Sequence, residues 1–141
     1  VVVLDNLSTG FENAVIGAEL VVGDTGDPEL VSRVLREHEV DAVMHFAAHT
    51  IVPESVSDPL KYYRNNTCNT RNLLQACSEN DVKHFIFSST AAVYGEPEAV
   101  PITEDAPVQP VNPYGQTKLA MERAMADVLT GACGDYTPLS W

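Results

Sequence analysis

The sequence has few basic residues, few cysteines and no long apolar run, and each shortage argues against a class of function. Its 8 lysines and arginines face 20 aspartates and glutamates, which gives a formal net charge of −12. This excess of negative charge disfavours nucleic acid and anionic membrane surfaces as partners. The longest apolar runs, such as residues 1–4 and 20–22, are far too short to cross a bilayer.

Cysteine and histidine are also too sparse and too irregular to indicate a metal site or a disulfide framework. Cys68, Cys77 and Cys133 are odd in number and lack CxxC spacing, which favours free thiols in a reducing compartment. The four histidines show no HExxH pattern, so we expect no metal. No charged segment followed by an apolar one marks a secretory signal, so we expect a cytoplasmic protein.

The pattern that is present is typical of an α/β protein. Four short apolar runs, rich in β-branched or aromatic residues, occupy residues 1–5, 19–24, 42–48 and 84–89. Nearly continuous apolarity over so few residues is typical of strands buried on both faces of a parallel sheet. Alternation of such strands with helices predicts right-handed crossovers and a Rossmann-like, doubly wound parallel sheet.

The helices are predicted from their start signals and apolar stripes. Two of them begin where aspartate suits the N-cap and proline the first turn, at Asp27 with Pro28 and at Asp58 with Pro59. Their apolar stripes consist of Leu30, Val31, Val34 and Leu35 in the first helix, and of Tyr62, Leu73, Leu74 and Ala76 in the second. A further helix is predicted from Pro113 to about residue 130, after a proline-rich surface loop over residues 95–113.

Ligands in an open α/β sheet bind outside the carboxyl ends of the strands, so the residues there are the first candidates. An acidic residue such as Asp5, at the end of the first run, can bond the adenosine ribose hydroxyls of a dinucleotide. Its charge would repel a 2′-phosphate and so favour NAD over NADP. Asp24, at the end of the second run, is a candidate for the adenine amino group. Each aspartate has a structural alternative, a loop cap for Asp5 and an Asx-turn for Asp24.

Three further groups at strand ends or in helices have both a functional and a structural interpretation. Ala47 and Ala48 are small enough to let a cofactor approach the backbone, although small residues also serve tight packing. Asn65 lies within a predicted helix, which asparagine does not favour, so its amide has either a role or a solvated position. The hydroxyl residues at 88–90 could bond a substrate oxygen, although serine also ends strands without any function.

The stretch NPYGQTK at residues 112–118 contains the most informative pair. Tyr114 and Lys118 lie one turn apart on the face of the helix that begins at Pro113. A free tyrosine titrates near ~10 and is a poor base at neutral pH. A neighbouring ammonium favours the phenolate and so makes tyrosine a usable proton acceptor. The pair is weak evidence alone, but it follows a strand that ends in hydroxyl residues within a βαβ array.

Together these motifs give the chain a clear resemblance. It resembles the extended short-chain dehydrogenase/reductase family of NAD-dependent epimerases and dehydratases, and within it the UDP-glucose 4-epimerase group. The matching stretches span nearly the whole chain in order: DNLSTG, GD at 23–24, HFAA, PESVSDPLKYYRNN, FSSTAAVYG and NPYGQTKLAME.

The resemblance implies a role for each matched position. It implies that Thr90 supplies the catalytic hydroxyl, that Tyr114 is the base and that Lys118 modulates it. It also implies that the cofactor NAD is bound by Asp5, Asn6, Asp24, Thr25, Phe46, Ala47, Ala48, Asn65, Ser88, Tyr114 and Lys118. The implied reaction interconverts UDP-glucose and UDP-galactose by oxidation at C4, rotation of the 4-keto sugar and re-reduction, in a homodimeric full-length protein.

Two positions bear on the subgroup. Many such epimerases place a lysine near the cofactor phosphates where this chain has Thr50. Related dehydratases carry an acidic pair after the catalytic threonine, whereas here Ala91 and Ala92 follow Thr90. Two alternatives remain open, an epimerase of another UDP-sugar (N-acetylhexosamine, glucuronate or pentose) and a non-catalytic NAD-binding relative.

The ends of the sequence predict a piece of a longer protein. It begins at Val1 inside an apolar run and stops at Trp141 in YTPLSW, which looks like the approach to another strand. We therefore expect residues 1–141 to form a partial NAD-binding Rossmann domain. The first strand, the glycine-rich turn and the C-terminal substrate domain would be missing. Alone, such a piece should be poorly soluble or partly unfolded, and inactive.

Overall fold

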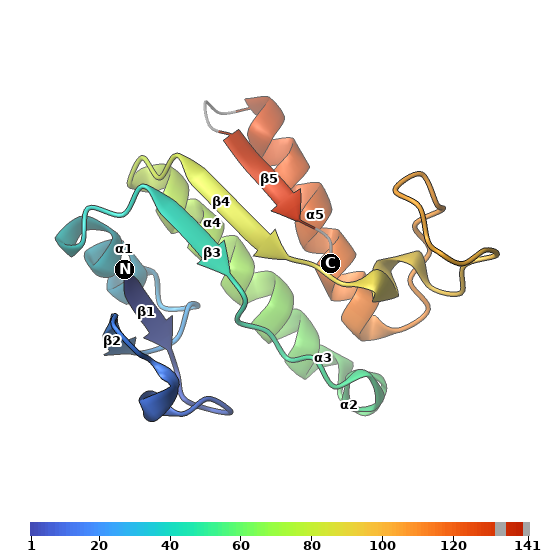
Figure 1. The fold of residues 1–141 in the computed structure, drawn as a ribbon, viewed down its shortest axis with the longest axis horizontal. Helices are drawn as coiled ribbons and strands as arrows, with labels where there is room; N and C mark the ends of the chain where they lie inside the picture. The colour runs from blue at the N-terminus through green and yellow to red at the C-terminus, as the bar shows by residue number, and fades with distance from the viewer. Residues whose placement is uncertain (132–134, 140–141) are drawn as a thin grey trace.

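The structure, a computed structural model, describes residues 1–131 and 135–139, with side chains as far as Val128. Its strands are all parallel and form two small sheets (Figure 1). In one sheet, β1 (Val2–Asp5) pairs with β2 (Glu19–Val22). In the other, β4 (His84–Ser88) lies between β3 (Ala42–His45) and β5 (Asp135–Leu139). The predicted α/β, Rossmann-like class is confirmed. Residues 136–139, expected only as the approach to another strand, themselves belong to strand β5.

The predicted helix starts are confirmed by their caps. Helix α1 (Pro28–Glu37) begins after Asp27, whose Oδ1 accepts hydrogen bonds from the N–H groups of Glu29 and Leu30 at 3.1 and 3.0 Å. Helix α3 (Pro59–Tyr62) begins after Asp58, whose Oδ1 accepts from the N–H of Lys61. Such caps satisfy N–H groups that a helix leaves without internal partners.

The remaining helices complete the crossovers. After α2 (Val52–Ser57), α3 continues through a π-helical stretch, η2 (Tyr63–Asn69), into α4 (Thr70–Glu79). Two short 3₁₀ turns, η1 (Glu12–Ala14) and η3 (Ala91–Tyr94), precede β2 and follow β4. Helix α5 (Pro113–Gly131) comes after the predicted proline-rich loop, which contains no helix or strand from Gly95 to Asn112. The π-helical stretch was not predicted.

The core lies between these helices and β4. Figure 1 shows α1, α4 and α5 together on one face of the strands. The core residues come from α1, β4, α4, the turn after α4, and α5: Val31, Leu35, Leu73, Leu74, Ala76, Cys77, Val82, Phe85, Phe87, Met121 and Met125. Full burial of each large apolar side chain contributes about 2 kcal/mol, so this one-sided cluster is the main apolar contribution within the described residues.

Two features of the predicted strands are wrong. The strands are not buried on both faces, because Val22 and Met44 remain about 60% exposed while the helices cover the other face. The second and third strands also end earlier than predicted, at Val22 and at His45. Residues 46–51 form an irregular segment instead, in which the side chain of Asn66 bonds both backbone groups of His49 and the hydroxyl of Tyr62 accepts from the N–H of Ile51.

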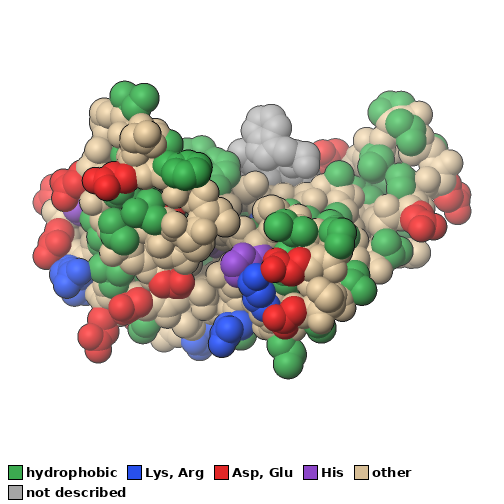
Figure 2. Space-filling model, turned by 90° about the horizontal axis from the view of Figure 1, so that it is seen from below, with side chains coloured by type: hydrophobic (Ala, Val, Ile, Leu, Met, Phe, Trp, Pro, Cys, Tyr) green, Lys and Arg blue, Asp and Glu red, His purple; other side chains and the backbone are tan. Residues whose placement is uncertain are grey.

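The surface agrees with the acidic composition. The face seen in Figure 2 carries acidic side chains across its width, with a few basic ones between them. Cys68 is exposed and Cys77 is buried, and both are free thiols, whereas Cys133 and Trp141 lie outside the described residues. Within the described part of the chain, no cluster of potential metal ligands occurs and no helix could cross a membrane.

His45, at the end of β3, predicts an acid sensitivity. It is 4% exposed, and its Nε2 lies 2.8 Å from Thr70 Oγ1. Burial, and then the charge of Lys118, lowers its pKa from 6.5 to about 4. Between these two pH values the unfolded chain binds a proton at His45 that the folded chain does not bind. The free energy of unfolding therefore decreases by up to about 3 kcal/mol as the pH is lowered from 6.5 to about 4.

Chemical denaturation at pH 7 and pH 4.5 measures this loss. The wild-type free energy of unfolding should fall by about 2 kcal/mol more than that of His45→Gln, because carboxylate effects cancel in the comparison. His84→Gln, at the exposed start of β4, is the matched control and should behave like wild type. An equal fall in His45→Gln and wild type would contradict the assignment.

Candidate active site

Helix α5 brings the predicted tyrosine and lysine to the carboxyl end of β4. Both side chains are buried, with Tyr114 8% and Lys118 3% exposed. The ring of Tyr114 packs against that of Tyr62 at 6.4 Å in a T-shaped arrangement. The N–H of Tyr114 donates to Ser55 Oγ at 3.2 Å, which ties the first turn of α5 to α2.

Lys118 points at the end of β4. Its Nζ donates to the carbonyl oxygen of Ser88 at 2.7 Å and lies 4.6 Å from the ring centroid of Phe87. Burial lowers the pKa of Lys118 from 10.5 to about 8, and the Glu122 carboxylate, one turn further along α5, partly opposes this. Lys118 therefore carries its charge at neutral pH and titrates just above it. An ammonium held in this way can stabilise a neighbouring anion.

The threonine that follows β4 is placed by a close approach of two elements. Thr90 is the N-cap of η3, and its Oγ1 accepts from the N–H of Ala92 at 3.2 Å. A Cβ at Gly115 would lie 2.6 Å from the carbonyl oxygen of Ala92. Only glycine therefore lets the first turn of α5, with Tyr114, pack this closely against the turn that Thr90 begins.

The predicted acidic residues lie at the ends of β1 and β2, and both structural alternatives occur. Asp5 Oδ1 accepts from the N–H of Leu7 at 2.6 Å, which caps the loop after β1. Asp24 accepts from the N–H of Gly26 at 2.8 Å, as in an Asx-turn, and also from the side-chain amides of Asn6 and Asn69 at 3.1 and 2.9 Å. Asp24 thus already has three donors, whereas a Cβ on Gly10 would lie 3.3 Å from Asp5 Oδ2, so the glycine keeps the side of this oxygen that it faces free of a side chain.

A polar groove of about 780 Å³ joins several predicted positions. Three predicted cofactor residues line it, Asn6, Asp24 and Asn65. The other lining residues are Ser8, His49, Asp58, Leu60, Lys61, Arg64 and Asn69.

The other predicted positions lie outside the groove lining. Phe46 is 61% exposed after β3, Ala47 is also exposed, and Ala48 is half-buried. Thr25 is half-buried after β2, and Thr50 is exposed.

This arrangement fits a dinucleotide on the chemistry of its donors and acceptors. Asp5 offers a carboxylate oxygen at a strand end, next to a glycine that leaves the approach open. Asn6 and Asn65 add side-chain amides to the groove lining, and Ala47 and Ala48, after Phe46, are small side chains in the segment that follows β3. Carboxylates at such strand ends bind ribose hydroxyls. Thr90, Tyr114 and Lys118, which lie beyond the end of β4 on η3 and α5, are residues that can move a proton to or from a hydroxyl.

A family match covers most of the chain. Residues 1–132 match the NAD dependent epimerase/dehydratase family. The chain belongs to this family.

Named relatives within the family are 4-epimerases. The chain is 56% identical over 127 residues to a UDP-glucose 4-epimerase of Azospirillum brasilense, covering 89% of this chain and 36% of that protein. It superposes with a TM-score of 0.96 on the crystal structure of UDP-glucose 4-epimerase from Brucella ovis in complex with NAD, at 44% identity.

That alignment covers 99% of this chain and 43% of the Brucella chain. A UDP-Glc/GlcNAc 4-epimerase from Campylobacter jejuni follows, with a TM-score of 0.91, 40% identity, and coverage of 99% of this chain and 44% of that one. The chain thus spans less than half the length of these relatives.

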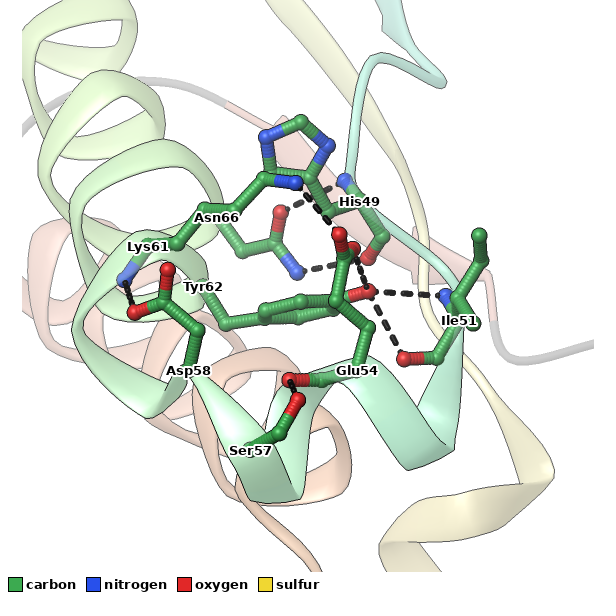
Figure 3. Close-up of polar contacts among 8 residues, drawn as sticks. All are labelled: His49, Ile51, Glu54, Ser57, Asp58, Lys61, Tyr62 and Asn66. Atoms are coloured by element: carbon green, nitrogen blue, oxygen red, sulfur yellow. Dashed lines mark hydrogen bonds and ion pairs between the residues drawn. The ribbon is translucent and has the colours of Figure 1, made fainter.

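Several residues that build the site were not predicted from the sequence. Gly115 directly follows the tyrosine, and a glycine inside a helical pattern signals close backbone approach. Tyr62 is predicted only as part of an apolar stripe, although its hydroxyl accepts from the N–H of Ile51 at 3.0 Å and has two acceptors within reach for its one proton, the Ile51 carbonyl oxygen at 2.7 Å and Glu54 Oε2 at 2.8 Å (Figure 3). Asn66, next to Asn65, is 2% exposed, and a second asparagine inside the same helix was an available signal for a buried polar role.

Proposed function

We propose that the protein containing these residues is an NAD-dependent UDP-hexose 4-epimerase that interconverts UDP-glucose and UDP-galactose. The observation that carries this proposal is the buried Lys118, bonded to the end of β4 one turn after Tyr114. The similarity to named UDP-glucose 4-epimerases supports the substrate class. Because the chain spans less than half of those relatives, the activity belongs to a protein that includes residues 1–141.

The chain's own residues supply the proton chemistry. The phenolate of Tyr114 accepts the proton of the sugar's 4-hydroxyl, and the hydroxyl of Thr90 bridges the two oxygens. Lys118, anchored at Ser88, favours the phenolate by its charge. When the 4-keto sugar is reduced on its other face, Tyr114 returns the proton to the oxygen.

NAD, when bound, supplies reversible hydride acceptance at C4. The residues that would hold it come from the strand ends, the groove and α5: Asp5, Asn6, Asp24, Thr25, Phe46, Ala47, Ala48, Asn65, Ser88, Tyr114 and Lys118. We propose that residues 1–141 form part of the cofactor-binding domain of a homodimeric, cytoplasmic enzyme. Substrate choice would rest mainly on residues beyond them.

The turn after β4 favours epimerisation over dehydration within this family. Elimination of water needs an acid near the site, whereas the first residues of η3 are Ala91 and Ala92. A second candidate, an epimerase that also accepts UDP-N-acetylhexosamines, is favoured by the similarity to the Campylobacter enzyme. Glucuronate and pentose sugars, and a non-catalytic relative, remain further alternatives.

A substrate panel tests the proposal. The full-length protein should convert UDP-galactose to UDP-glucose and back, followed by proton NMR of the anomeric signals. If the protein converts UDP-N-acetylhexosamine, UDP-glucuronate or UDP-pentose but not the hexose pair, the proposed substrate is wrong and the converted sugar takes its place. Failure to convert any of them, with NAD bound, would leave the non-catalytic alternative.

Asp5 should set the preference for NAD. Replacing it with serine removes the ribose-binding carboxylate and its repulsion of a 2′-phosphate. We expect Asp5→Ser to weaken NAD binding and to reduce discrimination against NADP by at least ~10-fold, which is about 1.4 kcal/mol. Titration calorimetry with both cofactors measures this, with the exposed Asp41→Ser as control. A wild-type protein that prefers NADP would show the role of Asp5 to be wrong.

A further inference from the structure

Three donors hold the carboxylate of Asp24 in place beyond the end of β2. The N–H of Gly26 and the side-chain amide of Asn69 both donate to Oδ1, at 2.8 and 2.9 Å. The amide of Asn6 donates to Oδ2 at 3.1 Å. A carboxylate has about four acceptor positions, two on each oxygen. Within the described part of the chain, Oδ1 is therefore filled and one position remains, on Oδ2.

Asn69 reaches this carboxylate from a different element. It is the last residue of η2 and is half-buried. Its amide passes close to the turn at Gly26, where a Cβ would lie 2.5 Å from Asn69 Oδ1 and 2.9 Å from Nδ2. These separations are too short for a side chain at residue 26. The approach of Asn69 to Asp24 therefore depends on the glycine between them.

A second asparagine joins the same two elements without using the carboxylate. Asn72, on α4, donates from Nδ2 to the carbonyl oxygen of Gly26 at 3.2 Å. It connects the helix to the backbone of the turn, whereas Asn69 connects the helix to the Asp24 side chain. Asn69 also lines the polar groove of about 780 Å³, together with Asp24 and Asn6. The contact between Asn69 and Asp24 thus lies where a ligand can meet it.

The remaining acceptor position on Asp24 suits a ligand that offers an N–H. The 6-amino group of adenine is such a donor, whereas a purine with an oxygen at carbon 6 presents an acceptor at the same place. An acceptor facing a carboxylate is repelled, and a site built to bond a donor discriminates strongly against a ligand without it. Because both oxygens of Asp24 are held, the carboxylate cannot turn to suit a different base edge.

We propose that Asn69 is a positioning residue for recognition of the adenine base, because it fixes the Asp24 carboxylate so that the dinucleotide site accepts a 6-amino purine and rejects a 6-oxo purine. This inference rests on the proposed function for its cofactor site. It adds a residue outside the predicted cofactor set. It concerns the adenine end of NAD and not the proton transfer at Tyr114.

Titration calorimetry tests the proposal on the full-length protein, freed of bound nucleotide. The two probes are NAD and nicotinamide hypoxanthine dinucleotide, which carries the 6-oxo base. We expect the wild type to bind NAD at least ~10-fold more tightly, the scale of a hydrogen bond to a charged group. Asn69→Ala should lower the affinity for NAD about tenfold and that for the analogue less than about threefold, so the preference shrinks.

Two further variants separate positioning from simple support of the fold. Gly26→Ala displaces the amide of Asn69 and should reduce the preference for NAD in the same way. Asn72→Ala is the matched control, because it removes a bond from the helix to the turn and leaves the bonds of Asp24 in place. Its preference should stay within about twofold of wild type. If Gly26→Ala does not fold, Asn69→Ala decides the question.

The outcomes distinguish this proposal from the proposed function. An unchanged preference in Asn69→Ala, or an equal loss of preference in Asn72→Ala, would overturn it. A wild type that binds both dinucleotides equally, or neither, would overturn it as well. A protein that shows the expected preferences but converts no UDP-sugar would instead refute the proposed function and leave the role of Asn69 intact.

Discussion

Tyr114→Phe is expected to lower kcat at least ~10²-fold in the full-length protein, the scale of a lost general base. Phenylalanine keeps the buried ring and its edge-on contact with Tyr62, so the fold and NAD binding should persist. Only the hydroxyl that accepts and returns the proton is removed. Turnover measured with each UDP-sugar, together with the amount of NAD retained after purification, separates lost chemistry from lost cofactor.

The exposed Tyr63 supplies the matched control for that experiment. Tyr63→Phe makes the same atomic change on the neighbouring helix and should leave kcat within about twofold. A Tyr114→Phe protein that turns over at nearly the wild-type rate would show that another group accepts the proton. Loss of NAD along with activity would assign Tyr114 to binding alone.

Lys118→Met should produce the second large loss, about 10²-fold in kcat at pH 7. The substitution removes the charge that favours the phenolate and the bond from Nζ to the Ser88 carbonyl, while it keeps a chain of similar length. Lys83→Met, before β4 and exposed, is the control and should be close to wild type.

The loss should depend on pH in a defined direction. Below about pH 8 Lys118 is protonated, because burial has lowered its pKa only to about 8. Its advantage over methionine is therefore fully present at neutral pH. As pH rises above 8, the lysine loses its charge and a tyrosine ionises without help. The ratio of wild-type to variant kcat should shrink from pH 7 to pH 10. A constant ratio would contradict an electrostatic role for Lys118.

The fold could be predicted from the sequence where a helix-start signal or a strand-like composition occurred together with an apolar pattern that indicates burial. Asp27 with Pro28 predicted the start of α1 because cap and apolar stripe agreed, and the same holds for Asp58 with Pro59. Phe85 and Phe87 predicted a buried strand and are 0% and 1% exposed. The proximity of Lys118 to the end of β4 followed from the crossover that joins them.

The rest depended on contacts that no local pattern contains. The third run ends as a strand at His45 because Asn66 and Tyr62, not a neighbouring strand, take the backbone groups of His49 and Ile51. Met44 is exposed although its run is apolar, since helices cover one face only. The closeness of α5 and η3 depends on the missing side chain of Gly115. Each is a property of pairs far apart in sequence.

The proposed epimerisation is a reversible oxidation at C4 of a UDP-hexose, and an isotope label tests it most directly. UDP-galactose deuterated at C4 would be incubated with the full-length protein, and the products followed by NMR. The expected product is UDP-glucose that keeps deuterium at C4, because the hydride that leaves C4 returns to it, and the ratio of the two sugars should be constant at long times. Loss of the label to solvent, a 4-keto-6-deoxy product, or no UDP-glucose at all would contradict it.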